Sequence, residues 1–109
     1  MKMPALGMSI TDWEQVAPTR HEGETGFALW RTRTFGEIRV RIVEYSPGYL
    51  ADHWCSKGHV ILCLDGFIEI ELADGARHEL RAGESYHVGD GDPGHRSRAP
   101  EGARLFIVD

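Results

Sequence analysis

Apolar and polar residues alternate with the two-residue period of β-strands through most of this chain. In 37–45, Ile38, Val40 and Ile42 share one face, and arginines lie between them on the other. The alternation recurs in 67–72, and 59–64 is a short apolar run typical of a buried strand. No segment keeps a period of about 3.6 residues over roughly three helical turns. The pattern predicts an all-β domain.

Turn sequences divide this pattern into short segments. Asp65-Gly66 and Asp74-Gly75 are typical of tight hairpin turns. Further strands are expected at 27–35, 76–81, 85–88, 95–98 and 103–108. About eight or nine short strands, with turns every 8–12 residues or so, are typical of a sandwich or a barrel.

The first residues do not share the alternation. Segment 1–25 contains Pro4, Pro18 and a polar stretch at 22–25, with one candidate short strand near 10–16. We therefore expect an N-terminal arm or edge strand over 1–25 and a single barrel domain over 26–109.

Composition narrows the functional classes. The 109 residues suit one domain, and the hydrophobic and charged shares of 41% and 27% are those of a globular protein. A net charge of −5 without a block of lysine and arginine argues against a nucleic-acid partner. The longest apolar run, 60–64, is far too short to span a membrane. With two cysteines and no apolar leader at the N-terminus, we expect a reducing, cytoplasmic location.

Four side chains that bind transition metals carry the main chemical signal. His53, Cys55 and His59 are separated by even intervals, so an extended backbone would place them on one face. His95 follows much later, after the glycine-rich loop 89–94. Imidazoles with a thiolate suit zinc, iron(II) or nickel rather than magnesium or calcium. The sequence therefore predicts a divalent transition-metal site.

The spacing of these residues resembles the first motif of the cupin superfamily, whose members are small jelly-roll β-barrels with a metal at the barrel centre. Gly48 opens the motif, His53 matches its first histidine, and Gly66 closes it. Cys55 replaces the second histidine and His59 replaces the glutamate. More narrowly, the chain resembles the small DHCW-motif cupins of bacteria.

The second cupin motif is also recognisable. Gly83 begins it, the loop 89–94 stands where its turn would be, and His95 matches its last histidine with one residue of slippage. The resemblance covers roughly 26–109 and implies an RmlC-like double-stranded β-helix. It also implies a homodimer, in which the arm at 1–25 could be exchanged between subunits.

Two ligand sets remain open. His53, His59 and His95 alone, with Cys55 nearby, would leave metal positions for water, substrate or O₂. All four residues together would close a tetrahedral site suited to structure or storage. We favour three histidines as ligands with Cys55 close by, and we assign Cys63 to the core.

Two classes of function follow. The first is a metal-dependent oxygenase, isomerase or lyase that acts on a small organic substrate. The alternative is a non-catalytic module that binds metal or small ligands at a closed His/Cys site. Tyr86, His87 and Asp92 are the candidates for acid–base roles. Arg39 and Arg41 are expected at the surface or in a dimer contact; with the opposite strand polarity, one could bind a substrate carboxylate.

Overall fold

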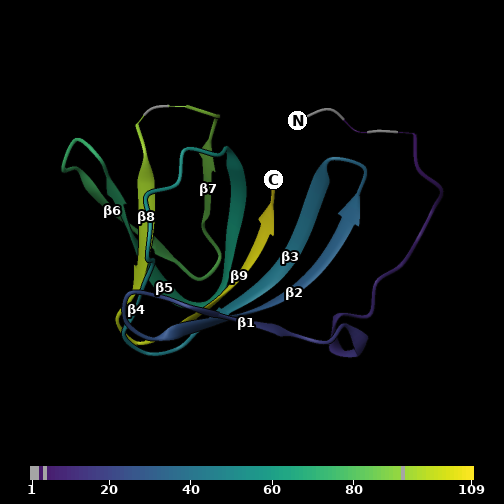
Figure 1. Cartoon of the computed structure of the whole chain (residues 1–109), viewed down its shortest axis with the longest axis horizontal. Helices are drawn as coiled ribbons and strands as arrows, with labels where there is room; N and C mark the ends of the chain where they lie inside the picture. Colours follow the sequence, from purple (N-terminus) through teal and green to yellow (C-terminus); the bar gives the residue numbers. More distant parts are fainter. Residues whose placement is uncertain (1–2, 4, 92) are drawn as a thin grey trace.

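The computed structural model describes residues 3, 5–91 and 93–109, which form one curled antiparallel sheet of nine strands. The strands are β1 (Thr19–Glu22), β2 (Phe27–Phe35), β3 (Ile38–Tyr45), β4 (Tyr49–Leu50), β5 (His59–Leu72), β6 (Arg77–Arg81), β7 (Ser85–Val88), β8 (His95–Ala99) and β9 (Ala103–Val108). Their order is β1-β2-β3-β9-β5-β8-β4, and β6 and β7 also pair with β5. Figure 1 shows the sheet curling from β2 and β3, through β9 and β5, to β8 and β6. The predicted all-β class is confirmed.

A single long strand, β5, closes this curl. Its first half pairs with β7 and β9, and its second half pairs with β6 and β8. The hairpin predicted at Asp65-Gly66 is wrong, because the chain continues there as one strand with a register shift between Cys63 and Asp65. Gly66 has a φ of 74°, and a Cβ on it would lie 2.6 Å from the carbonyl oxygen of Gly102. The glycine thus bends the strand rather than reversing it.

The polarity of β3 is the reverse of the preferred interpretation. Val43 belongs to the central apolar cluster, and Arg41, on the same face, is only 5% exposed. Ile38 and Ile42 are also buried, but on the opposite face of the strand. Arg39 and Arg41 can face inward because each forms an ion pair there with Asp109, as described below.

The apolar core lies inside the curl. It is built from the inward positions of several strands and contains Ala28, Val43, Tyr49, Ile61, Cys63, Ile68, Ile70, Leu80, Ala99, Leu105 and Ile107. Burial of such side chains stabilises the fold by about 25 cal/mol per Å² of apolar surface. The assignment of Cys63 to the core is confirmed by its 1% exposure.

Within the N-terminal segment, β1 pairs with β2, and the turn before β1 is held to β2 by a side chain of that strand. The strand expected near 10–16 is wrong, since Trp13–Gln15 forms a short 3₁₀ turn, η1, with Asp12 at its N-cap. The Nη1 atom of Arg31 on β2 donates to the carbonyl oxygens of residues 13, 14 and 16 at 3.0, 3.3 and 2.7 Å. No helix among the described residues is long and apolar enough to span a bilayer.

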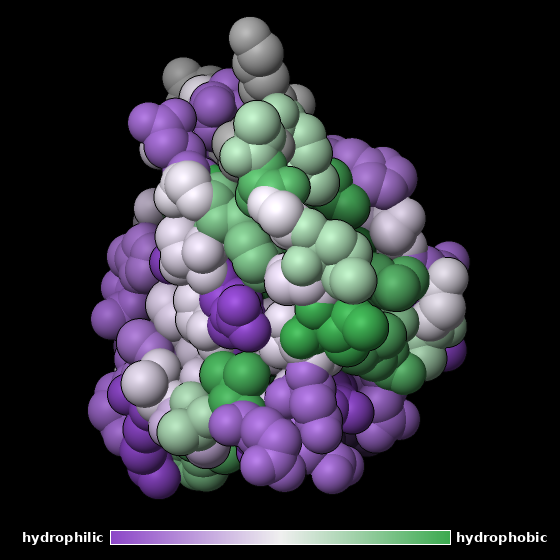
Figure 2. Space-filling view, turned by 90° about the vertical axis from the view of Figure 1, so that its right-hand side faces the viewer, coloured by the Kyte–Doolittle hydropathy of each residue, from purple (hydrophilic) through white to green (hydrophobic). Residues whose placement is uncertain are grey.

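Apolar side chains of the arm remain on the surface. Met8 and Ile10 are 89% and 86% exposed, and Leu6 is 45% exposed. Figure 2, which looks at the molecule from the side of the arm, shows apolar surface gathered on that face. Isolated exposed apolar residues are ordinary, but a contiguous group of them is typical of a contact surface.

Candidate metal centre

Three of the four predicted ligands come together at one end of the barrel. Cys55, His59 and His95 each place one donor atom within 4.8 Å of the donor atoms of the other two. The Sγ of Cys55 lies 3.3 Å from Nε2 of His59, and the rings of His59 and His95 meet edge to face with centroids 5.1 Å apart. One thiol and two imidazoles form a donor set suited to zinc or another late transition ion.

Backbone contacts hold the three residues in place. His59 begins β5 opposite Val88 of β7, and His95 begins β8. Cys55 lies in the connection before β5, where it forms an isolated antiparallel bridge with His95. Gly58 lets this connection pass close to β7, since a Cβ there would lie 2.9 Å from the carbonyl oxygen of Val88. The donor atoms are therefore arranged by the fold itself.

His95 is the residue that most needs a further partner. It is 4% exposed, and neither of its ring nitrogens has a hydrogen-bond partner within the described part of the chain. A buried polar group without a partner costs about 1–3 kcal/mol. Burial and the charge of nearby His59 lower the pKa of His95, which favours the neutral form that binds metals. A transition-metal ion at this position would satisfy the ring, so the residues present fit the group.

His53 lies outside this group. Its side chain is 72% exposed, and its Nδ1 lies 2.7 Å from a carboxylate oxygen of Asp52. The prediction that placed it with Cys55 and His59 assumed an extended backbone, but the chain bends at residues 52 and 53. The two-residue alternation of a strand is lost at this bend, and the His53 ring points into solvent.

Asp109 is a site residue that the sequence analysis missed. Its side chain is fully buried, and its Oδ2 accepts a hydrogen bond from Nδ1 of His59 at 2.8 Å. Arg39 donates to both carboxylate oxygens at 2.9 and 3.1 Å, and Arg41 donates to Oδ2 at 3.0 Å. The strand alternation could have predicted that Asp109 points inward, because Asp109 lies on the same face as the buried residues Leu105 and Ile107.

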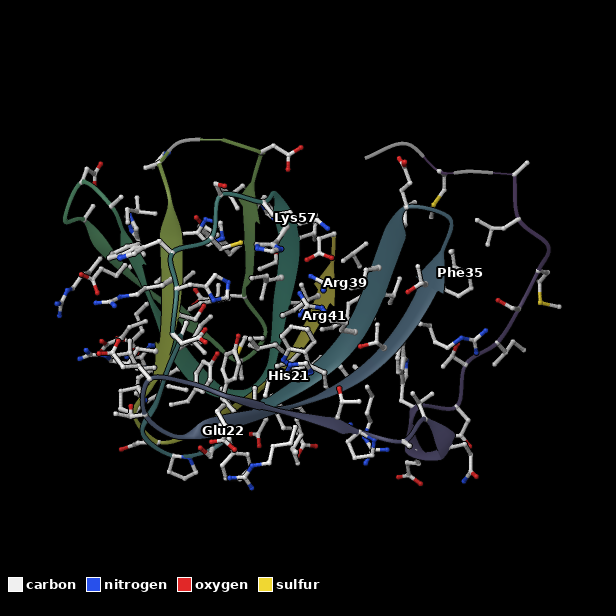
Figure 3. The ribbon with its side chains drawn as sticks, in the orientation of Figure 1. His21, Glu22, Phe35, Arg39, Arg41 and Lys57 are labelled. Atoms are coloured by element: carbon white, nitrogen blue, oxygen red, sulfur yellow. The ribbon has the colours of Figure 1, made fainter. Side chains whose placement is uncertain are left out.

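The charge of Asp109 is stabilised by these neighbours. Burial alone would raise the pKa of its carboxyl group, but hydrogen bonds from His59 and Arg39 and the positive charges of Arg41 and Arg39 bring that pKa well below its ordinary value. Figure 3 shows Arg39 and Arg41 extending from β3 into the curl of the sheet. Arg41 also lies over the ring of Trp30, with 4.4 Å from its Cζ to the ring centroid.

The other acid–base candidates lie around the group or away from it. Tyr86 faces His95 at 6.1 Å between ring centroids, and burial raises the pKa of its phenol. His87 points the other way, where its exposed ring contacts Ser85 at 2.8 Å. Asp92 lies outside the described residues.

A pocket of about 390 Å³ lies next to His59, and neither Cys55 nor His95 is among the residues that line it. Its lining includes His59 and Asp109, together with Lys57, Gly58, Val88 and Asp90. This volume falls in the range of about 300–1,000 Å³ that small-molecule sites occupy. The pocket gives a small molecule a place next to His59.

Solved structures of other proteins share this architecture. A structure described as a predicted oxalate decarboxylase from Thermotoga maritima is similar with a TM-score of 0.79 and 13% identity, covering 92% of this chain and 96% of its own. An RmlC-like cupin from Shewanella frigidimarina gives a TM-score of 0.71 at 21% identity, with 94% and 89% covered. Ectoine synthase from P. lautus gives 0.71 at 21% identity, with 93% and 76% covered. No family model and no curated protein matches the sequence.

These similarities establish the fold. The chain has the jelly-roll barrel of the cupins, so the predicted fold is confirmed. The narrower resemblance to the DHCW group stays a prediction. Residues 52–55 read Asp-His-Trp-Cys, so Trp54 and Cys55 stand in the opposite order to the letters of that motif.

Proposed function

We propose that this chain, which has the cupin fold, is a metal-dependent enzyme acting on a small organic molecule. Cys55, His59 and His95 would hold one divalent zinc, iron(II) or nickel ion. The observation that carries the proposal is the buried His95 ring, which has no hydrogen-bond partner within the described part of the chain and lies beside two further donor groups. Among the similar structures, ectoine synthase and a sugar phosphate isomerase are named as enzymes, which supports a catalytic use of this barrel.

The arrangement favours an open site over a closed one. Three protein ligands leave positions for water or substrate, as in catalytic metal sites, whereas structural zinc sites are closed by four. Such an ion, when bound, polarises a carbonyl oxygen or lowers the pKa of a bound water molecule. Asp109 accepts a hydrogen bond from Nδ1 of His59, and the pocket next to His59 would receive the substrate.

Metal content of suitable variants tests the ligand set. The protein would be purified without a nickel column, and its bound metal would be measured by mass spectrometry. Cys55→Ser and His95→Ala should each lose most of the metal, since each removes one of three ligands. His78→Ala, an exposed change on β6, should retain it and serves as the matched control. Full metal retention in His95→Ala, or a wild-type protein that binds none of these ions, would overturn the proposal.

His53→Ala separates the open site from the alternative, a non-catalytic module with four ligands. The open site predicts unchanged metal content in this variant, because His53 lies in solvent. A loss matching that of Cys55→Ser would favour the closed site. Anaerobic reconstitution with iron(II) and an O₂-uptake assay, followed by zinc and nickel with panels of organic acids and thiols, then tests catalysis. No turnover with any of these metals would count against the enzyme.

We also propose that the protein is a cytoplasmic homodimer. The apolar side chains of the arm, with Met8 and Ile10 almost fully exposed, support a partner on that face. Sedimentation equilibrium would show a dimer, and Met8→Ser with Ile10→Ser should shift it toward monomer. A monomeric wild-type protein at micromolar concentration would contradict this.

A further inference from the structure

We infer that Asp109 is a positioning residue for the metal centre. By accepting a hydrogen bond from one ring nitrogen of His59, it fixes the tautomer and the ring orientation that present the other nitrogen to Cys55 and His95. This inference rests on the proposed function, because it concerns how one proposed ligand is prepared to bind the ion.

The two nitrogens of His59 have different neighbours. Nδ1 lies 2.8 Å from Oδ2 of Asp109, while Nε2 lies 3.3 Å from Sγ of Cys55. An ionised carboxylate only accepts hydrogen bonds, so the proton of a neutral His59 ring must reside on Nδ1. Nε2 then carries the lone pair, and it is the nitrogen that faces the other two donor residues. A carboxylate behind a metal-binding imidazole is a frequent arrangement in metal sites.

Asp109 is itself held rigidly. Its carboxylate receives two hydrogen bonds from Arg39 and one from Arg41, and its backbone exchanges hydrogen bonds with the backbone of Arg39. The Arg41 guanidinium is in turn buried against Trp30. The carboxylate therefore has little freedom to turn away from His59, and the ring orientation is set before any metal arrives.

The hydrogen bonds of Asp109 also show how an amide would behave in its place. Three donors converge on Oδ2, namely His59, Arg39 and Arg41, whereas only Arg39 reaches Oδ1. An asparagine would therefore place its oxygen at the Oδ2 position and keep the contact with His59. Alanine removes the acceptor altogether. These two substitutions separate loss of charge from loss of the acceptor.

The tautomer of His59 can be read directly in metal-free protein by long-range ¹H–¹⁵N NMR correlation. Wild type and Asp109→Asn should show the Nδ1–H form, and Asp109→Ala should show a mixture with the Nε2–H form. A wild-type ring in the Nε2–H form would overturn the inference. This measurement needs no bound metal, so it decides the inference even if the proposed function fails.

Zinc affinity, measured by competition with a chromophoric chelator, supplies the second readout. Asp109→Ala should weaken zinc binding about 10–100-fold, the usual effect of removing such a partner. Asp109→Asn should stay within about threefold of wild type. Arg81→Met is the matched control, because it breaks an exposed ion pair to Glu79 on β6 rather than one to Asp109. If all three variants lose affinity in proportion to their loss of stability, Asp109 has only a structural role and the inference is wrong. If Asp109→Ala does not fold, the wild-type tautomer and the Asp109→Asn affinity decide.

Discussion

Cys55 and His95 exchange both of their backbone hydrogen bonds, with N···O distances of 2.7 Å from Cys55 to His95 and 2.9 Å in return. This closely paired bridge lies outside the regular strand ladders and joins the connection before β5 to the first residue of β8. Two proposed ligands that are distant in sequence are therefore brought together by main-chain contacts.

Replacing His95 by leucine should separate stability from metal binding. The ring is buried with both nitrogens unpaired within the described residues, and leucine offers similar volume without polar atoms. We expect the metal-free variant to be as stable as wild type or more stable by about 1–3 kcal/mol, because an unsatisfied group is removed. Metal retention should be lost. Urea unfolding in the presence of a chelator measures the first effect, and a clear loss of stability would contradict it.

Alanine should be tolerated much better at Gly75 than at Gly66. Both glycines have positive φ values, 95° and 74°, so each substitution carries a conformational cost of about 1–2 kcal/mol. At Gly75 a Cβ meets nothing within 4 Å, whereas at Gly66 it meets the Gly102 carbonyl oxygen at 2.6 Å. Gly66→Ala should therefore cost about 1–3 kcal/mol more than Gly75→Ala in thermal or urea unfolding. Equal losses would show that β5 does not bend as described.

Removing the Arg31 guanidinium should release the N-terminal turn. In Arg31→Met the three hydrogen bonds to the carbonyl oxygens of 13, 14 and 16 are lost while the aliphatic stem remains. We expect chymotryptic cleavage near Trp13 to accelerate about tenfold or more, because local opening becomes easier. Arg77→Met, which alters an exposed side chain, is the control. Unchanged cleavage in Arg31→Met would mean that other contacts hold the arm.

Stability should fall at alkaline pH through the stacked tyrosines Tyr45 and Tyr49. Burial raises the pKa of both phenols above their ordinary value of 10.0, and for Tyr49 the charge of Tyr45 raises it further. A raised pKa in the folded state contributes stability that is complete below pH about 10 and is lost as the pH rises above it. Tyr49→Phe should therefore lose less unfolding free energy than wild type between pH 9 and about 11.5. Parallel pH profiles for the two proteins would contradict this.

The strands were predictable wherever alternation and turn residues agreed. The strands over 27–35 and 103–108 follow from local pattern, and so does the turn at Asp74-Gly75. The hairpin prediction at Asp65-Gly66 was wrong because this dipeptide is compatible both with a hairpin turn and with a bend within a strand. Only the pairing of β5 with β9 distinguishes the two. The polarity of β3 was equally undecidable from its own sequence, since a buried arginine requires a partner that lies elsewhere in the chain.

The site was predictable to the extent that spacing reflects strand geometry. The motif pattern selected His53, Cys55, His59 and His95, and the fold brings the last three together. The even interval from His53 to Cys55 did not predict that their side chains share a face, because the backbone bends at residues 52 and 53, between strands. Asp109 was overlooked because its role depends on contacts with β3 and β5 rather than on a motif.

The place of β9 between β3 and β5 also governs the order in which this protein can form. Because β3 and β5 are both paired to β9, the strand ladder between them is not complete until β9, which follows both in the sequence, has been made. During synthesis, the edges of β3 and β5 that pair with β9 in the folded protein therefore remain unpaired, and they are exposed to association with other chains. Long-range pairing of this kind is slow to form. The same final step brings Asp109 to His59, so a barrel that has not closed also lacks a prepared metal centre.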